Sequence, residues 1–412
     1  PVLRWGWSGR VLRRGAVVAA LGPVLLATPT VRADDVRGGQ RAVIETLDLA
    51  KAWRTTKGAG VLVAVLDSGV DRRHRDLAGS VRMGKDFTEG ANPRGVTPRR
   101  LHGTYMASLI AGHGHGPKGK RGIIGVAPEA DVLSVRVILE DEEPGFREFN
   151  SAERFENVVA RGIRYAVDEG ADVINMSISK ELATRQERAA IRYAISRGVV
   201  LVAAAGNHGE RKIDGGFAPY SYPAAFPGVV SVGATDRRLR RAAFSNWNSS
   251  VLVSAPGVDI MGAGPGDQYW VGRGTSQATA LVSGVAALIK AKYPDMSPPL
   301  VARALSTGAT DRPPGGYDTA TGFGVVNAAR ALTEAAKLAG HTEAAKGADA
   351  HDPAMPLAGG VAGPVKVITR DQRQVTLYSA VAAAAGAGAL ASLAVIFVLV
   401  RRVRRAQSSQ EA

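Results

Sequence analysis

The sequence contains no cysteine among its 412 residues. This absence excludes a disulfide-stabilised scaffold, a zinc or iron–sulfur site with cysteine ligands, and a thiol nucleophile. It does not assign a redox compartment, because a large exported domain can fold without disulfides. Aromatic residues are also few, at 6% of the chain, so there is no sign of the stacking residues of a nucleic-acid binder. The hydrophobic fraction of 45% is ordinary and excludes wholesale disorder.

The positive charge of the chain is concentrated at its two ends. The net charge is +15, but residues 1–33 carry five arginines and no acidic residue. Residues 401–412 carry four arginines and one glutamate, which leaves +7 for residues 34–400. Nucleic-acid binding rests on the net charge alone, and it is therefore the weaker interpretation.

The first 33 residues have the three-part pattern of an export signal. A basic start is followed by an apolar run over residues 15–27 and by small residues at Val31 and Ala33. This pattern predicts a signal peptide, residues 1–33, that is cleaved near Ala33. The alternative is an uncleaved anchor helix, for which the apolar run is short.

A second apolar segment lies near the other end, where residues 377–400 contain no charged side chain. At about 1.5 Å per residue this segment reaches about 36 Å, enough to cross a hydrocarbon core of roughly 30 Å. Arginines follow at once in residues 401–412, and basic flanks stay cytoplasmic. We therefore expect one C-terminal transmembrane helix, a basic cytoplasmic tail, and an extracytoplasmic main domain at the cell membrane. The alternative is a soluble or surface-lying helix.

Between the two ends, residues 61–335 alternate between apolar β-rich runs and helical stretches. Strands are expected at residues 61–66, 132–138, 173–178, 199–204 and 229–232. Helices are expected at residues 102–112, 152–169, 181–197, 275–292 and 298–306. This alternation predicts an α/β domain with a parallel sheet flanked by helices. An N-terminal extension, residues 34–60, precedes the domain, and residues 336–376, rich in Ala, Gly, Pro and Lys, predict a flexible linker.

Three positions beside these elements carry residue types that can work together. Asp67 follows the first strand, His102 opens a helix, and Ser276 begins a helix behind a glycine turn. Each signal is weak alone, because such residues also end strands, cap helices and form loops. Together, the order Asp, His, Ser is one of the three chain orders of the hydrolytic triad. In that triad an imidazole takes the proton of the hydroxyl, and a carboxylate holds the tautomer of the imidazole.

Four motifs in chain order then give a resemblance to a known family. They are Val65-Leu66-Asp67-Ser68-Gly69-Val70, His102-Gly103-Thr104, Ala204-Ala205-Gly206-Asn207 and Gly274-Thr275-Ser276-Gln277-Ala278. Residues 61–330 resemble a subtilisin-like serine protease, or subtilase, over about two-thirds of the chain. The resemblance implies a subtilisin-like three-layer fold and endopeptidase activity through an acyl-enzyme on Ser276. It implies no required cofactor and leaves calcium binding open.

The resemblance also assigns further site residues. Asn207 matches the side-chain donor of the oxyanion hole, paired with the backbone N–H of Ser276; the alternative is a turn residue. Six residues match the two sides of a groove that receives substrate as an added strand. They are Ser177, Ile178 and Ser179 on one side and Ala204, Ala205 and Gly206 on the other. The chain departs from the family at Ser179, where Gly is usual, at Ala280, where Pro is usual, and at Gln277, where an apolar residue is commoner.

The layout of the whole chain resembles a narrower group, the mycosins. These are membrane-anchored proteases of type VII secretion systems, although they usually have disulfides in the protease domain. Two functions remain open: a membrane-tethered serine endopeptidase, or a catalytically silent protease-fold scaffold of a membrane secretion complex. The expected partners are a polypeptide substrate, the membrane and a secretion-system membrane complex, without nucleic acid.

Two other polar clusters have simpler interpretations. His113 and His115 could ligate a metal, but a polar glycine loop is favoured because no third ligand is evident nearby. No metal site is therefore predicted. The acidic run of residues 140–143 predicts a solvated loop, with a subsite for basic residues or a calcium contact as the alternatives.

Overall fold

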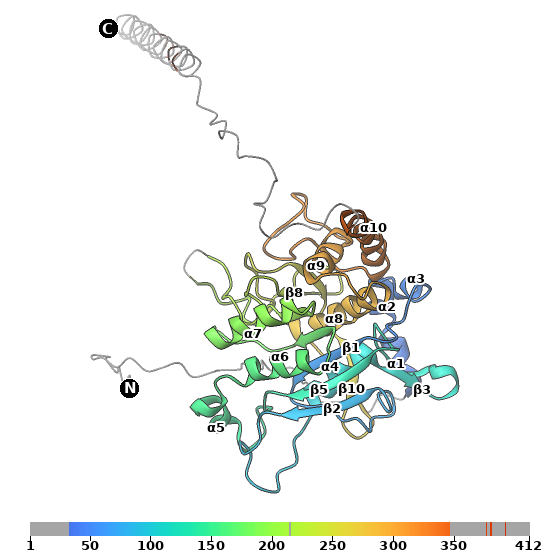
Figure 1. Cartoon of the computed structure of the whole chain (residues 1–412), viewed down its shortest axis with the longest axis vertical. Coiled ribbons are helices and arrows are strands. Elements are labelled where there is room, and N and C mark those ends of the chain that lie inside the picture. Colours follow the sequence, from blue (N-terminus) through green and yellow to red (C-terminus); the bar gives the residue numbers. More distant parts are fainter. Residues whose placement is uncertain (1–32, 214–215, 347–375, 377–379, 381–391, 393–412) are drawn as a thin grey trace, which may run out of the picture. The chain divides into compact units, whose positions relative to one another are not determined.

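The computed structural model describes residues 33–213 and 216–346 together with positions 376, 380 and 392 (Figure 1). The chain divides into two units, Pro1–Ala348 and Asp349–Ala412, and the account below concerns the first. The predicted signal peptide up to residue 32, the transmembrane segment 377–400 apart from Ala380 and Ser392, and the basic tail 401–412 lie outside the described residues. In the part of the chain that is described, no helix has the length and apolar character needed to cross a membrane.

The domain is built on a seven-stranded sheet with the order β2-β5-β1-β6-β7-β8-β9, and every neighbouring pair is parallel. The strands are β1 Leu62–Asp67, β2 Val81–Asp86, β5 Asp131–Arg136, β6 Val173–Met176, β7 Val200–Ala204, β8 Val230–Thr235 and β9 Val253–Pro256. The five predicted strands correspond to β1, β5, β6, β7 and β8. Their consecutive apolar residues are buried on both faces of the sheet, as expected for parallel strands.

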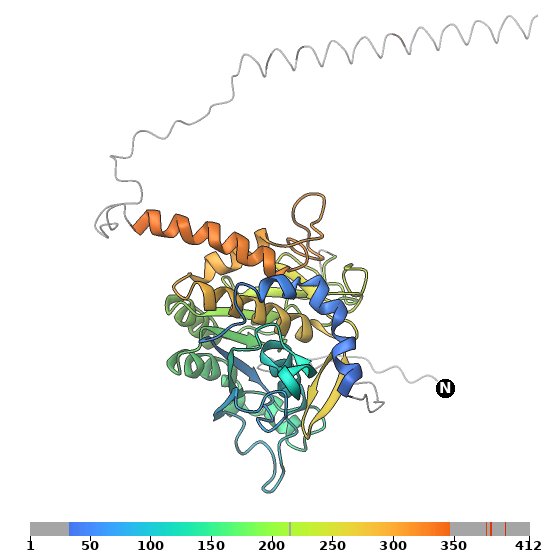
Figure 2. The same ribbon diagram turned by 90° about the vertical axis from the view of Figure 1, so that its right-hand side faces the viewer.

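Alternate residues of the central strands pack into two separate cores. Val63 and Val65 of β1 face the core formed with α4 Leu101–Ala111 and α8 Thr275–Lys292. Ala64 and Leu66 face the core formed with α6 Val158–Asp168 and α7 Arg185–Ser196. This follows from the two-residue period of a strand. Figures 1 and 2 show α6 and α7 together on one side of the sheet, so the sheet is the middle of three layers.

Helix α8 runs through the interior of the domain. Every residue from Thr275 to Lys290 is buried, which is unusual for a helix and fits its composition of small and apolar residues. A side-chain carbon at Gly284 would lie 2.5 Å from Cβ of Val126, so only glycine allows this close approach. The helix therefore holds its first residues, which include Ser276, in a fixed position relative to the sheet.

The N-terminal extension follows the surface of the domain as α1 Ala33–Gly39, α2 Arg41–Thr46 and α3 Leu49–Ala52, blue in Figure 2. Val36 is buried in a small core with Ile123 and Met261. The Gln40 side chain donates to the carbonyl of Ile124 and accepts from its N–H, both at 2.9 Å. The extension is thus bound to the domain by both apolar and polar contacts.

The C-terminal part of the domain corrects one boundary. Helix α9 Pro298–Thr307 agrees with the prediction, but α10 Ala328–Lys346 continues into the predicted linker. Residues 336–346 are therefore helical, because their Ala, Lys and Glu residues are strong helix formers. The start of α10 is joined to the N-terminal extension, since the N–H of Ala328 donates to the carbonyl of Leu47 at 2.8 Å.

The remaining elements were not predicted from the sequence. They are the short helices α5 Phe146–Ser151, η1 Pro117–Gly119 and η2 Glu153–Phe155, and the hairpins β3 His113–His115 with β4 Arg121–Ile124 and β10 Ile260–Gly264 with β11 Gln268–Gly272. Because η2 interrupts it, the helix predicted at 152–169 begins only at Val158 in α6.

Candidate active site

Asp67 is the last residue of β1 and is fully buried. One of its carboxylate oxygens accepts the backbone N–H of Ser68 at 2.7 Å. The apolar strand in front of it is paired on both sides, with β5 and β6. A carboxylate at this place is therefore held at the carboxyl edge of the sheet, where ligands bind in open α/β folds.

His102 is the second residue of α4, and its ring faces Asp67. The Nδ1 atom lies 2.8 Å from Oδ1 and 3.0 Å from Oδ2 of the carboxylate. Since a carboxylate accepts, Nδ1 carries the proton and Nε2 is the basic nitrogen of the neutral ring. Nε2 is buried and has no hydrogen-bond partner among the described residues. This is the protonation pattern that a general base needs.

Charge around His102 favours its protonated form. Burial lowers the pKa of the imidazole, but the adjacent Asp67 charge and hydrogen bond, followed by Glu140 and Asp141, raise it, and the net shift is upward from 6.5. A raised pKa makes the ring a stronger base and stabilises the imidazolium that forms when it accepts a proton.

Ser276 is the second residue of α8 and is 4% exposed. Its hydroxyl donates to the carbonyl of Ser177 at 3.2 Å rather than to His102. A second bond joins the two serines, since the hydroxyl of Ser177 donates to the backbone carbonyl of Ser276 at 3.0 Å. Helices α4 and α8, which carry His102 and Ser276 in their first turns, pack against each other.

Asn207 lies at the start of α8 in space, although it follows β7 in the chain. Its Oδ1 accepts from both the N–H and the hydroxyl of Thr275, each at 2.9 Å. These two bonds fix the orientation of the amide and leave Nδ2 as its donor. The next backbone N–H in the helix belongs to Ser276. The amide of Asn207 is therefore held against Thr275, the residue that directly precedes Ser276.

The predicted groove segments follow two adjacent strands, β6 and β7. Ser177, Ile178, Ala204, Ala205 and Gly206 are buried, and Ser179 is half-buried. Gly206 has φ of 105°, and a side-chain carbon there would lie 2.5 Å from Nδ2 of Asn246, so this position requires glycine. The structure thus brings the two predicted edges together at the carboxyl ends of their strands.

A cavity of about 240 Å³ adjoins the groove segments. It is lined by Ser179, Lys180, Glu181, His208, Pro219, Tyr220, Ser221 and Asn246. The hydroxyls of Ser179 and Ser221 are hydrogen-bonded to each other in its wall. The serine that replaces the usual glycine of the family therefore bonds to a second hydroxyl instead of lying free in the groove.

The acidic run of residues 140–143 is not the solvated loop predicted from the sequence. Glu140 and Glu143 are 4% and 3% exposed, whereas Asp141 and Glu142 are exposed. Glu143 pairs with the buried Arg136 guanidinium at 2.6 Å. These carboxylates are buried because specific partners in the fold compensate their charge, which composition alone does not reveal.

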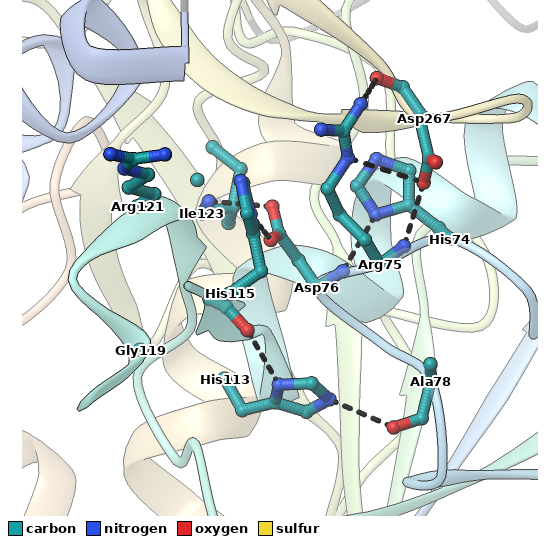
Figure 3. Close-up of polar contacts among 12 residues, drawn as sticks. His74, Arg75, Asp76, Ala78, His113, His115, Gly119, Arg121, Ile123 and Asp267 are labelled. Carbon is teal, nitrogen blue, oxygen red and sulfur yellow. Dashed lines mark hydrogen bonds and ion pairs between the residues drawn. The ribbon is translucent and has the colours of Figure 1, made fainter. Parts of the chain in front are cut away.

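The histidine pair predicted in a polar glycine loop lies instead in strand β3, within a polar cluster around Asp76 (Figure 3). His115 Nδ1 contacts Oδ1 of Asp76 at 2.6 Å, and the ring nitrogens of His113 contact the carbonyls of Gly114 and Ala78 at 2.7 and 3.1 Å. Across the described residues, no group of three His, Asp or Glu side chains is arranged to hold a metal ion.

The sequence and the structure were compared with known proteins. A model described as "Subtilase family" matches residues 58–324. The intracellular serine protease of Paenibacillus polymyxa is 34% identical over 60% of this chain and 72% of that protein. Thermitase of Thermoactinomyces vulgaris is 36% identical over 60% of this chain and 80% of its own length. Subtilisin E of Bacillus subtilis is also 36% identical, but the match spans only 61% of its length.

Solved structures extend the similarity beyond the matched sequence. The crystal structure of MycP1 from Mycobacterium smegmatis is 26% identical, with a TM-score of 0.59 over 78% of this chain and 89% of that one. Fervidolysin from Fervidobacterium pennivorans, a keratinolytic enzyme related to subtilisin, is 28% identical, with a TM-score of 0.61 over 75% of this chain and 50% of that one.

Proposed function

Because this chain belongs to the subtilase family, we propose that it is a serine endopeptidase whose triad is Asp67, His102 and Ser276. One observation supports this assignment best. The buried imidazole of His102 is held by Asp67 through Nδ1, while Nε2 has no partner among the described residues and remains available as a base. A purely structural histidine would have both ring nitrogens satisfied.

The chemistry follows from these positions. On substrate binding, the Ser276 hydroxyl leaves the carbonyl of Ser177 and gives its proton to His102 Nε2 as Oγ attacks the peptide carbonyl carbon. The imidazolium then donates that proton to the leaving amine, and the acyl-enzyme ester remains on Ser276. A water molecule repeats the sequence, since its proton passes to His102 and returns to Ser276 Oγ when the acid product leaves. Asp67 stays ionised and orients the ring throughout.

The negative charge that develops on the carbonyl oxygen has two donors. They are Nδ2 of Asn207, oriented through Thr275, and the backbone N–H of Ser276 in the first turn of α8. The free N–H groups and the dipole of this helix start favour the same charge. Because the charge is absent in the ground state, these donors accelerate the reaction more than they strengthen binding.

The substrate is a polypeptide, bound as an added strand between residues 177–179 and 204–206. The backbone groups of the two segments supply affinity, and the neighbouring cavity receives a side chain close to the cleaved bond. This proposal requires no cofactor, since every step uses protein groups and water.

We further propose that the enzyme is tethered to the cell membrane with its catalytic domain extracytoplasmic and its C-terminus cytoplasmic. The sequence pattern of residues 1–33, 377–400 and 401–412 supports this topology. The similarity to MycP1 over 78% of this chain supports association with a type VII secretion complex. The second candidate function, a catalytically silent scaffold of such a complex, is favoured only by that same similarity.

Labelling with a fluorophosphonate separates the two functions. The wild type is expected to form an adduct that mass spectrometry locates on Ser276, and Ser276→Ala is expected to lose both the adduct and peptide hydrolysis. Ser283→Ala is the matched control, because it removes a buried hydroxyl from the same helix. The scaffold function instead predicts that wild type and Ser276→Ala are equally unreactive.

Topology is tested on intact cells. External protease is expected to degrade residues 34–373 and to spare the tail 401–412. A tag placed after Ala412 that is accessible from outside would refute the proposed orientation without affecting the assignment of the triad.

A further inference from the structure

Glu140 lies in the loop after β5 and connects the end of strand β1 to the start of helix α4. Its side chain is buried, although the residue next to it, Asp141, is exposed. Oε1 accepts the hydroxyl of Ser68 at 2.7 Å and the backbone N–H of His102 at 2.9 Å. One carboxylate oxygen therefore joins the residue that follows Asp67 to the backbone of His102.

The start of α4 depends on these bonds because it has no cap of its own. The residue before the helix, Arg100, has φ of 55° and makes no side-chain capping bond. The N–H of His102 is satisfied by Glu140, and the N–H of Gly103 by the hydroxyl of Ser68 at 3.0 Å. Such free N–H groups at a helix start otherwise need water or a capping side chain. Glu140 and Ser68 thus replace the missing cap from two other segments.

The carboxylate also belongs to the charges that surround His102. The charges that raise the pKa of His102 are Asp67 from β1 and Glu140 and Asp141 from the loop after β5, while Arg99 and Arg100 stand in the segment just before α4. Arg99 lies 3.6 Å from Oε2 of Glu140 and 3.2 Å from a carboxylate oxygen of Glu142. Burial raises the pKa of Glu140 above its ordinary value of 4.5, and the bonds from Ser68 and His102 offset part of this rise. Two donors on one oxygen and a guanidinium near the other fit an ionised carboxylate.

We propose that Glu140 is a positioning residue for His102: it holds the start of α4 against the end of β1 and places a second buried negative charge beside the imidazole. Glu140 does not touch the substrate; it acts through the backbone and the charge state of His102. The inference rests on the proposed role of His102 as the general base, and it adds a carboxylate that the triad motifs do not contain.

Glu140→Gln tests the charge without removing the shape. The glutamine oxygen can still accept from Ser68 and His102, so the fold is retained. Loss of the negative charge is expected to lower the pKa of His102, which moves the acid limb of the kcat/KM profile to lower pH by about half a unit or more. The plateau at higher pH is expected to fall about three- to tenfold through kcat with little change in KM, because a weaker base removes the proton less well.

Glu142→Gln is the matched control. It removes the exposed partner of the same Arg99 and is expected to leave the acid limb within about 0.2 pH unit of wild type, because solvent screens an exposed charge. If Glu140→Gln lowered the rate equally at every pH, with the limb unmoved and the melting temperature reduced, Glu140 would be a structural residue only and the proposal would be overturned.

A second readout does not depend on hydrolysis. The ring of His102 is titrated by NMR in the Ser276→Ala background, with its signal among the seven histidines identified by its loss in His102→Asn. Glu140→Gln is expected to shift this titration to lower pH, and an unchanged titration would contradict the proposal. A shift in a protein whose wild type shows no hydrolysis would leave the role of Glu140 standing and remove only the proposed function.

Discussion

Among the described residues, Asp67 and Asp76 are two buried aspartates that each contact a histidine, but in surroundings that differ. Asp67 and His102 are separated by 2.8 Å, and Asp76 and His115 by 2.6 Å. Both aspartates are fully buried, so the distance and the burial do not distinguish the pairs. The difference lies in what surrounds them, and it shows that an aspartate–histidine contact by itself indicates no activity.

The second pair is satisfied by structural partners. The other oxygen of Asp76 accepts the N–H of Ile123 at 2.7 Å (Figure 3). It also accepts the hydroxyl of Tyr269 at 2.9 Å, so the carboxylate joins the β3–β4 and β10–β11 hairpins. In the first pair, His102 Nε2 is left without a partner in the described part of the chain. An orphaned buried nitrogen beside a helix start is the feature that separates a catalytic candidate from a structural cross-link.

The largest predicted effect is the difference in kcat between two variants that each remove the aspartate charge of one pair. Asp67→Asn is expected to lower kcat by about 10⁴-fold, because the amide no longer holds the imidazole in the tautomer with a basic Nε2. Asp76→Asn is expected to leave kcat per folded molecule within about twofold of wild type, because its partners are structural. Steady-state hydrolysis, normalised to active sites by fluorophosphonate titration, measures both.

If Asp76→Asn kept its fold but lost much of its kcat, the two pairs would be coupled. The contrast between a catalytic and a structural pair would then be wrong. An Asp67→Asn variant with nearly full activity would remove Asp67 from the triad.

The next largest effect is expected at Asn207, a donor for which the second pair has no counterpart near a nucleophile. Asn207→Ala should reduce turnover about 10²- to 10³-fold with little change in KM, the loss known for one oxyanion-hole donor in subtilisin, a member of the same family. Asn207→Asp should be worse, since a carboxylate repels the oxyanion. Turnover and melting temperature are measured on one preparation, and a loss of stability without a loss of rate would make Asn207 a turn residue.

For the free energy of unfolding, unlike for kcat, the substitution at the second pair is expected to have the larger effect. Asp76→Asn should lower the free energy of unfolding by roughly 2 kcal/mol, because a buried carboxylate with three partners is replaced by an amide that satisfies fewer of them. Urea unfolding followed by circular dichroism measures this change. Ser276→Ala is the control, and it should change the unfolding free energy by less than about 1 kcal/mol. Equal stability of Asp76→Asn and wild type would contradict the structural role.

The smallest predicted effect concerns the dependence of kcat/KM on pH. His102 must be neutral to accept a proton, so activity is lost as pH falls through the pKa of its ring. Since the charges around it raise this pKa above 6.5, kcat/KM of the free enzyme at pH 6.5 should be less than half of its plateau. The profile is measured with a peptide substrate at constant ionic strength. An acid limb centred below pH 6.5 would show that burial outweighs the neighbouring charges.

Much of the sheet edge that carries the candidate active site could be predicted, because buried parallel strands are seen in the sequence as continuous apolar runs. The strand predicted at 61–66 is observed as Leu62–Asp67, and Asp67, His102 and Ser276 lie at the expected ends of their elements, with Asn207 in the loop after β7. Strand β2 was missed because it is an edge strand with Arg82, Lys85 and Asp86 among its six residues. Its exposure allows polar residues, so no apolar run marks it.

The second pair and Glu140 could not be predicted for a different reason. Asp76 and His115 stand 39 positions apart in segments without a motif, and only the hairpin brings them together. Glu140 belongs to an acidic run whose composition indicates solvent, while its partners come from the end of β1 and the start of α4. A buried charged residue cannot be identified from composition, because the groups that hydrogen-bond or neutralise it are brought next to it only by folding.

The bond between the carbonyl of Leu47 and the N–H of Ala328 also has a mechanical consequence. It joins the N-terminal extension to α10, and Asn327 reinforces it by donating to the carbonyl of Thr46 at 3.4 Å. A tensile load that enters through the C-terminal end of α10 is therefore shared with α2 and α3 before it reaches the sheet. If the protein is tethered by its C-terminus as proposed, the extension braces the place where that load enters the domain and helps to keep strain from the end of β1, where Asp67 lies.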